Sequence, residues 1–188
     1  MMKSVLPIVL VIIGLKITGQ LANVVSFGQS AVLKTGLLNA GTESDEEEVF
    51  DFGFTAYSPS GERLRPESLQ NKVIFLNIWA TWCGPCRSEM PTIQSLYNSV
   101  DKTNIVFVML AVDRVNSDQK VKQYIETNQY TFPVYILKGE PTTQIRVPII
   151  PTTYIISKEG KILRKEVGMK NYDTEKFRNF LLKEANGN

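Results

Sequence analysis

The chain has 188 residues, 43% of them hydrophobic and 21% charged, which indicates one globular domain with an appendage and excludes a wholly disordered, collagen-like or coiled-coil chain. The formal net charge of +2 does not indicate a nucleic-acid-binding surface. The absence of histidine excludes imidazole general-base catalysis, histidine-ligated metal sites and a Cys–His protease. Two cysteines are too few for a disulfide-stapled miniprotein or a four-ligand structural zinc site, and we expect no metal.

An apolar run occupies residues 5–15, directly after a short start that carries one lysine. This pattern is typical of a secretory signal, and the run is shorter than the roughly 20 residues of a full transmembrane helix. Apolar residues continue past it and no small-x-small cleavage motif closes it, which favours an uncleaved signal anchor over residues 1–27 above a cleaved signal peptide. Pro7 and Gly14 count against a buried core helix.

Export by either route would place the rest of the chain in the periplasm or another extracytoplasmic space, and the favoured uncleaved anchor would hold it at the inner membrane by its N-terminus. Residues 28–49 are predicted to form a stalk and an acidic linker, since five of the six residues at 43–48 are acidic and such runs are usually solvated. The globular domain is predicted over residues 50–188.

Strand and helix signals alternate along this domain. In chain order, the pattern predicts a hairpin over 52–57 and 62–64, a buried strand over 72–79, a helix over 85–100, a buried strand over 104–112, a helix capped by Ser117, a short strand over 133–137, a hairpin over 152–157 and 161–167, and a last helix near 173–185. The early strand–helix alternation indicates a parallel α/β core, and the late hairpin adds antiparallel strands.

The chemistry is expected in the segment Trp82-Cys83-Gly84-Pro85-Cys86, which follows a buried strand and opens a helix. At the helix N-terminus, unpaired backbone N–H groups and the helix dipole favour the Cys83 thiolate, which is the species that attacks a disulfide. Cys86 lies one turn further along, on the apolar face, and is expected to be shielded and to resolve a mixed disulfide. The position of the motif disfavours the alternatives of a static disulfide or an inert thiol pair.

Residues 78–86 (IWATWCGPC) resemble the thioredoxin superfamily, and residues 50–185 resemble its TlpA/ResA-like branch of exported, often membrane-anchored thiol–disulfide oxidoreductases. Asn77 replaces the buried aspartate of thioredoxins, Glu89 follows the second cysteine by three residues, and Ile150-Pro151-Thr152 resembles the cis-proline loop. The resemblance implies a thioredoxin-like α/β fold, with a central mixed sheet flanked by helices and an N-terminal β-hairpin extension.

Three residues next to the motif have expected roles. Glu89 shares a helix face with Cys86, and a carboxyl in an apolar environment can exchange protons with a buried thiol. The alternative is an exposed Glu89 near Arg87. Asn77 is expected to be a neutral polar group of the core, and Trp79 to be a core residue.

Substrate contacts are expected around the cysteines. We expect a cis peptide bond before Pro151, which would let the Ile150 backbone pair with an extended substrate strand; the alternative is an ordinary strand-starting proline. Trp82 is expected to be exposed. The full set of expected substrate-binding residues is Trp82, Gly84, Pro85, Ile150 and Pro151.

The favoured function is a disulfide reductase for exported proteins, because Gly84-Pro85 is the thioredoxin dipeptide, which favours reduction. We expect a protein disulfide as substrate, a membrane thiol–disulfide electron donor, a monomeric chain and no cofactor beyond the Cys83–Cys86 pair itself. The resemblance implies cytochrome c maturation as one client pathway.

Three alternatives stay open. A disulfide oxidase or isomerase would run the same chemistry backwards. A thiol peroxidase is disfavoured because Ala80 occupies the place, three residues before the first cysteine, where such enzymes usually carry threonine. A non-enzymatic peptide-binding module is disfavoured by the intact cysteine pair.

Overall fold

The structure is a computed structural model that describes residues 48–114 and 117–187. The predicted signal segment and most of the predicted linker lie outside the described residues. The elements are β1 (Thr55–Tyr57), the 3₁₀ helix η2 (Pro66–Leu69), β2 (Val73–Trp79), α3 (Gly84–Ser99), β3 (Ile105–Ala111), α4 (Asp118–Thr127), β4 (Val134–Lys138), β5 (Thr152–Ile156), β6 (Ile162–Val167) and α5 (Glu175–Asn186).

Within the described part of the chain, six strands form one mixed sheet in the order β1-β4-β3-β2-β5-β6. β2, β3 and β4 are parallel, while β1, β5 and β6 are antiparallel to their neighbours. β2 lies near the centre, and all of its seven residues are buried, as its nearly continuous apolar sequence predicts. The predicted mixed α/β sheet of the thioredoxin-like fold is confirmed.

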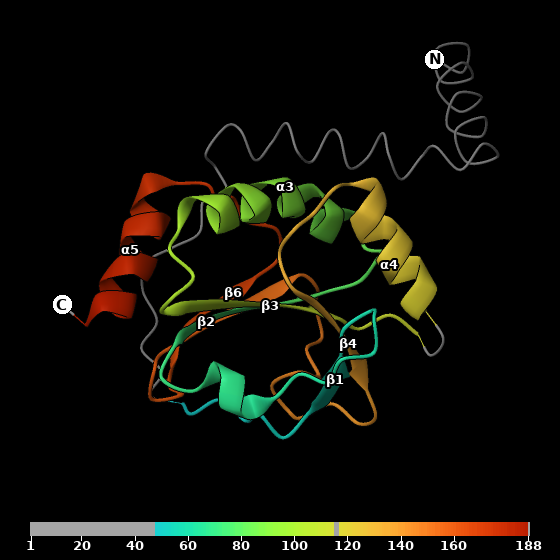
Figure 1. Cartoon of the computed structure of the whole chain (residues 1–188), viewed down its shortest axis with the longest axis horizontal. Coiled ribbons are helices and arrows are strands. Elements are labelled where there is room, and N and C mark those ends of the chain that lie inside the picture. Colours follow the sequence, from blue (N-terminus) through green and yellow to red (C-terminus); the bar gives the residue numbers. More distant parts are fainter. Residues whose placement is uncertain (1–47, 115–116, 188) are drawn as a thin grey trace, which may run out of the picture.

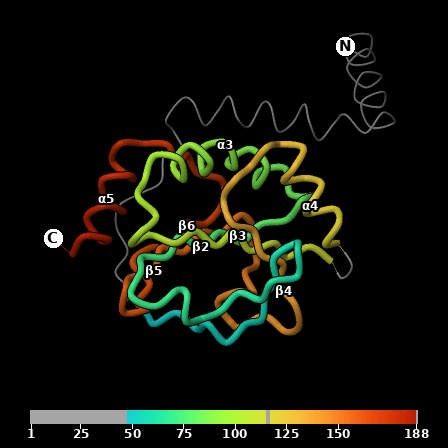
Figure 2. The backbone as a smooth tube through the Cα atoms, viewed as in Figure 1, coloured from blue at the N-terminus to red at the C-terminus, as the bar shows by residue number. Residues whose placement is uncertain are grey.

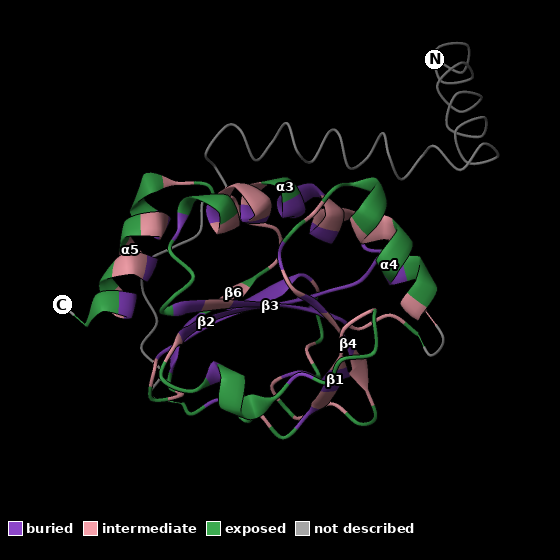
Figure 3. Ribbon diagram, viewed as in Figure 1, coloured by how far each residue is buried: buried purple, intermediate pink, exposed green. Residues whose placement is uncertain are grey.

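The three α-helices of the described residues cover the same face of the sheet (Figure 1). The two parallel crossovers through α3 and α4 step in the same direction along the sheet, so their common hand places both helices on one side. Met90, Val121 and Phe177 bring one residue from each helix into the core on this face. Figure 3 shows buried residues in the sheet and exposed residues on the outer sides of the helices.

The opposite face is covered by η2 and by irregular segments near residues 50–70 and 139–151, whose backbone Figure 2 follows. Phe50, Leu69 and Ile145 from these segments pack with Ile74 and Tyr154 of the sheet in a second hydrophobic cluster. This face therefore has a thinner cover than the helical face.

The N-terminal hairpin differs from the prediction in its extent. Strand β1 begins at Thr55 rather than at residue 52, because the Asp51 side chain accepts the Gly53 N–H (2.8 Å) in a local turn. The predicted second strand over 62–64 is reduced to one bridge between Tyr57 and Arg63. β1 instead pairs with β4, so the predicted hairpin extension is one edge of the main sheet.

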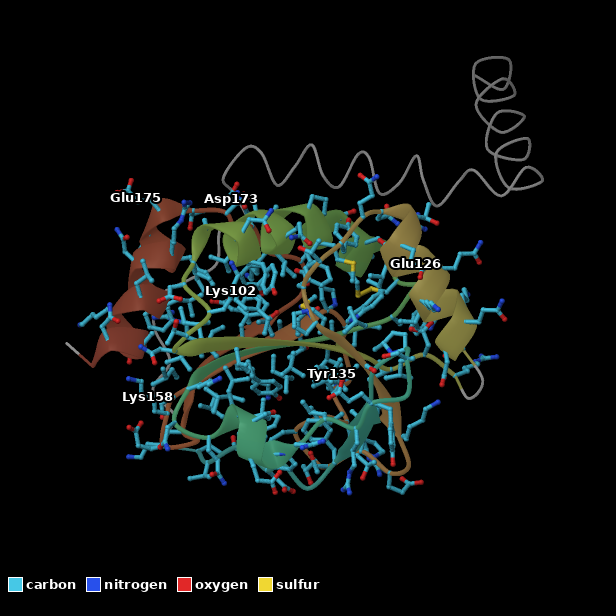
Figure 4. All side chains as sticks on the ribbon, in the orientation of Figure 1. Lys102, Glu126, Tyr135, Lys158, Asp173 and Glu175 are labelled. Atoms are coloured by element: carbon cyan, nitrogen blue, oxygen red, sulfur yellow. A yellow bond between two sulfur atoms is a disulfide. The ribbon has the colours of Figure 1, made fainter. Side chains whose placement is uncertain are left out.

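A side chain caps the start of α5 but not the start of α4. Thr174 caps α5, since its hydroxyl accepts the Phe177 N–H (3.2 Å), and Asp173 and Glu175 lie beside it at this end of the helix (Figure 4). Ser117 lies at the predicted cap position of α4, but its hydroxyl donates to the Arg114 carbonyl (2.6 Å) and caps no helical N–H. The helix start was predicted correctly and its capping bond was not.

The described chain begins beside the turn that joins β5 and β6. The Ile162 N–H donates to the Glu48 carbonyl (2.7 Å), and the Phe50 N–H donates to the Gly160 carbonyl (2.9 Å). Val49 forms a bridge with Lys161. Two residues that the sequence pattern assigned to the linker thus pair with the sheet.

Within residues 48–114 and 117–187, no helix has both the length and the apolar character needed to cross a membrane.

Candidate functional site

The cysteine pair lies at the turn from β2 into α3. Cys83 is the N-cap residue of α3, and a disulfide with an S–S distance of 2.08 Å joins it to Cys86, drawn in yellow in Figure 4. The Cys86 backbone N–H donates to the Cys83 sulfur at 3.2 Å. The same N–H would stabilise a thiolate on Cys83 after reduction, because a helix N-terminus has unpaired donors. Cys83 is 5% exposed and Cys86 is fully buried, so Cys83 is the more accessible of the two residues.

Asp113, which follows β3, fixes the approach to this turn. Its carboxylate accepts the Thr81 N–H at 3.0 Å and the Thr81 hydroxyl at 2.5 Å. Sequence reasoning missed this contact, because the two residues are 32 positions apart. The one available signal was that parallel β2 and β3 end together, which places the residues that follow them at the same edge of the sheet.

The loop before β5 lies against the nucleophile. The Ile150–Pro151 peptide bond is cis, as predicted. The carbonyl oxygen of Ile150 lies 3.7 Å from the Cys83 sulfur. The structure therefore brings together two segments that are 67 residues apart in sequence.

Exposed apolar side chains lie in the segments next to the cysteines. Trp82 is 62% exposed, as predicted, while Trp79 is fully buried in the core. Ile149 precedes the cis-proline loop, and Val167 pairs with Thr152 in the β5–β6 register; both are about half exposed. Sequence reasoning did not single out these last two residues. Gly84 and Pro85 are partly buried in the first turn of α3, and the substrate contacts of the predicted set stay a prediction.

Glu89 is fully buried on the inner side of α3, so the alternative of an exposed helix-surface glutamate is wrong. One carboxyl oxygen accepts from the Asn77 side-chain amide (2.8 Å), and the other accepts the Lys170 backbone N–H (3.1 Å). Burial raises the pKa of Glu89 to about 8, although both hydrogen bonds and the positive charge of Lys170 act in the opposite direction. A carboxyl with such a pKa can give or take a proton near neutral pH.

Asn77 is buried in β2, as predicted, and its amide nitrogen also donates to the Thr153 hydroxyl (2.8 Å) on β5. Thr153 and Lys170 were not predicted as site residues. Asn77 and Thr153 are opposite each other in the antiparallel register of β2 and β5, a pairing that only the assembled sheet determines. Within the described part of the chain, no group of three metal-ligating side chains is close enough to hold a metal ion.

The part of the chain that carries the cysteine pair and the cis-proline loop is similar to known proteins. Residues 47–165 match the model of the AhpC/TSA family. The thiol–disulfide oxidoreductase ResA of Bacillus cereus (strain ZK / E33L) is 32% identical over 116 residues, which cover 61% of this chain and 66% of that protein. The thioredoxin-like protein YneN of Bacillus subtilis is 35% identical over 116 residues, covering 61% and 68%. The chain thus spans about two thirds of the length of these relatives.

Solved structures show the same fold. StoA from Bacillus subtilis superposes with a TM-score of 0.56 and 26% identity, covering 73% of this chain and 98% of StoA. A putative thiol-disulfide oxidoreductase from Bacteroides vulgatus gives a TM-score of 0.61 at 20% identity, covering 77% and 99%, and this likeness concerns the fold alone.

Proposed function

The chain belongs to the AhpC/TSA family, its described domain is that of a thiol–disulfide oxidoreductase of the ResA-like type, and we propose that the protein acts as a disulfide reductase on exported proteins. The observation that supports this most is the Cys83–Cys86 pair at the start of α3, in which Cys83 is the more accessible residue and its sulfur lies beside the Ile150 carbonyl. The thioredoxin dipeptide between the cysteines favours the reducing direction.

The proposed cycle begins with the reduced pair. The Cys83 thiolate attacks one sulfur of the substrate disulfide, that S–S bond breaks, and a mixed disulfide forms while the released substrate thiolate takes up a proton. Cys86 then loses its proton and attacks the Cys83 sulfur, which releases the second substrate thiolate. The substrate gains two electrons, and Cys83–Cys86 becomes the disulfide.

Glu89 is proposed as the group that accepts the Cys86 proton in the second step. Its complete burial one helical turn beyond Cys86 and its raised pKa support this role. Trp82, Gly84, Pro85, Ile150 and Pro151 are proposed to contact the extended substrate segment. A second thiol–disulfide protein at the membrane would supply the two electrons that restore the dithiol.

Export and N-terminal anchoring are part of the same proposal, and they rest on the apolar run at residues 5–15 and on the family likeness. The protein is also proposed to act as a monomer. A thiol peroxidase is a weaker reading: Ala80 lies three residues before Cys83, and the neighbouring Thr81 hydroxyl is bonded to Asp113.

The reduction potential of the Cys83–Cys86 pair tests the direction. We would equilibrate the full-length chain with thiol buffers and follow the fluorescence of Trp79 and Trp82. A potential near that of thioredoxin, about −270 mV, is expected for a reductase. A potential near about −120 mV would instead identify a disulfide-forming oxidase. The Cys83→Ser variant is the control and should show no titration.

A further inference from the structure

A buried polar cluster connects Glu89 to three other parts of the fold. Glu89 on α3, Asn77 on β2 and Thr153 on β5 are each at most 1% exposed. The Lys170 backbone N–H approaches from the segment between β6 and α5. Buried polar groups of this kind need partners, and here the partners come from elements that only the finished fold brings together.

The Asn77 amide nitrogen is the centre of this cluster. It carries two hydrogens, and it donates to two acceptors, the Glu89 carboxyl and the Thr153 hydroxyl, each at 2.8 Å. The Asn77 side-chain oxygen is buried and has no hydrogen-bond partner among the described residues. The orientation of this amide is therefore determined by its two acceptors and not by its oxygen.

We infer that Thr153 and Asn77 are positioning residues for Glu89: the Thr153 hydroxyl holds one N–H of the Asn77 amide, which keeps the other N–H directed at the Glu89 carboxyl. Without that hydroxyl, the amide can turn and present its oxygen to Glu89. An N–H stabilises the ionised carboxylate, whereas the amide oxygen stabilises the protonated acid. The inference rests on the proposed function, in which Glu89 exchanges a proton with Cys86.

The charged and titratable groups around Glu89 do not take the place of the hydrogen bond from the Asn77 amide to the Glu89 carboxyl. On α3 itself the nearby titratable group is Cys86. The segment after β6 contributes Lys170, whose charge favours the carboxylate, and the buried Tyr172, whose pKa is raised by burial and by the charge of Glu89. Glu166 on β6 lies opposite Thr153 in the strand register and pairs with Lys170 at 3.8 Å. From β2 and β5, the groups that contact Glu89 directly or through the amide are the neutral Asn77 and Thr153.

The test is a carboxyl titration of Glu89 by carbon-13 NMR in the reduced, full-length protein, assigned with Glu89→Gln. Thr153→Val keeps the side-chain shape and removes the hydroxyl, so the Glu89 midpoint should rise by about half to one pH unit. Thr153→Ser keeps the hydroxyl and should retain the wild-type midpoint. Ser157→Ala removes another buried hydroxyl at the far end of β5 and should also leave the midpoint unchanged.

An unchanged midpoint in Thr153→Val, or an equal shift in Ser157→Ala, would overturn the inference. A second measurement needs no variant: in the wild-type protein, the Asn77 side-chain N–H signals should shift with the same midpoint as the Glu89 carboxyl, and signals independent of that midpoint would also overturn it. Neither result depends on the reduction potential, so a protein that proves to be an oxidase leaves this test intact.

Discussion

At Glu89, two physical effects oppose each other. Burial penalises its charge, while the Asn77 amide, the Lys170 N–H and the Lys170 charge stabilise that charge. Burial is the larger effect, so the folded protein holds the proton up to a pKa of about 8, against an ordinary value of 4.5. The unfolded chain gives up this proton at much lower pH, and the difference couples folding to pH.

Glu89 should therefore make the protein less stable as the pH rises from about 4.5 to 8, because the native state binds one proton more than the unfolded state over that interval. The loss from this residue is on the order of 5 kcal/mol. Chemical denaturation of the oxidised protein at several pH values measures it. Glu89→Gln should abolish most of this slope, whereas Glu126→Gln, on the exposed face of α4, should retain it. A slope of wild-type size in Glu89→Gln would refute the assignment.

The sequence predicts this residue only in part. The helical spacing places Glu89 on the same face as Cys86, since that relation is local. The partners of Glu89 are 12 and 81 positions away, and the Asn77–Thr153 contact spans 76 positions. Such contacts depend on strand order and register, which one sequence without the fold does not determine.

At the scale of elements, the turn from β2 into α3 is held by β3. Asp113 follows β3 and accepts both the backbone and the side-chain hydrogen of Thr81, which is itself buried. Without the carboxylate, the Thr81 N–H would be left in the interior with no acceptor, which is costly. The segment that presents Cys83 therefore depends on a strand that does not carry the motif.

Asp113→Ala should lower the free energy of unfolding by about 2 kcal/mol, as expected for a lost charged acceptor. Asp101→Ala is a matched control, since Asp101 also accepts an N–H and a hydroxyl from one threonine, Thr103, but in an exposed loop. Urea denaturation of the two variants should show a clearly smaller loss for Asp101→Ala. Equal losses of unfolding free energy would mean that the Asp113 contact beside the cysteine turn stabilises the fold no more than the exposed Asp101 contact does.

The prediction of elements succeeded where the signal was local and continuous. The buried strand β2, the apolar face of α3 and the β5–β6 hairpin follow from apolar runs and from turn residues. Helix η2 was not predicted, because four residues are too few to show a period. The Ser117 capping bond was predicted wrongly: the Ser117 hydroxyl donates to the Arg114 carbonyl, and its oxygen accepts no N–H from the start of α4.

For the whole molecule, the two faces of the sheet have separate tasks. The helical face carries the cysteines and Glu89, whereas the opposite face is closed by η2 and irregular segments. Leu69, 5% exposed, brings η2 into the second cluster. Removing this side chain should therefore affect stability and leave the redox chemistry unaltered.

Leu69→Ala should cost about 2–5 kcal/mol of unfolding free energy, the usual range for a leucine removed from a core. The reduction potential of the cysteine pair should stay at its wild-type value, because the sheet lies between the two sites. Glu67→Ala, on the exposed side of the same 3₁₀ helix, is the control for stability. A shifted potential in a folded Leu69→Ala protein would show that the two faces are coupled.

The position of Glu48 has a consequence for orientation. Glu48 is bonded to Ile162 beside the β5–β6 turn, whereas Cys83 follows the last residue of β2 at the opposite end of the sheet. The described chain therefore enters the domain at the end of the sheet remote from the cysteines. The length of β2 separates this entry point from Cys83, so a partner that approaches Cys83 and the Ile150–Pro151 loop meets the opposite end of the sheet.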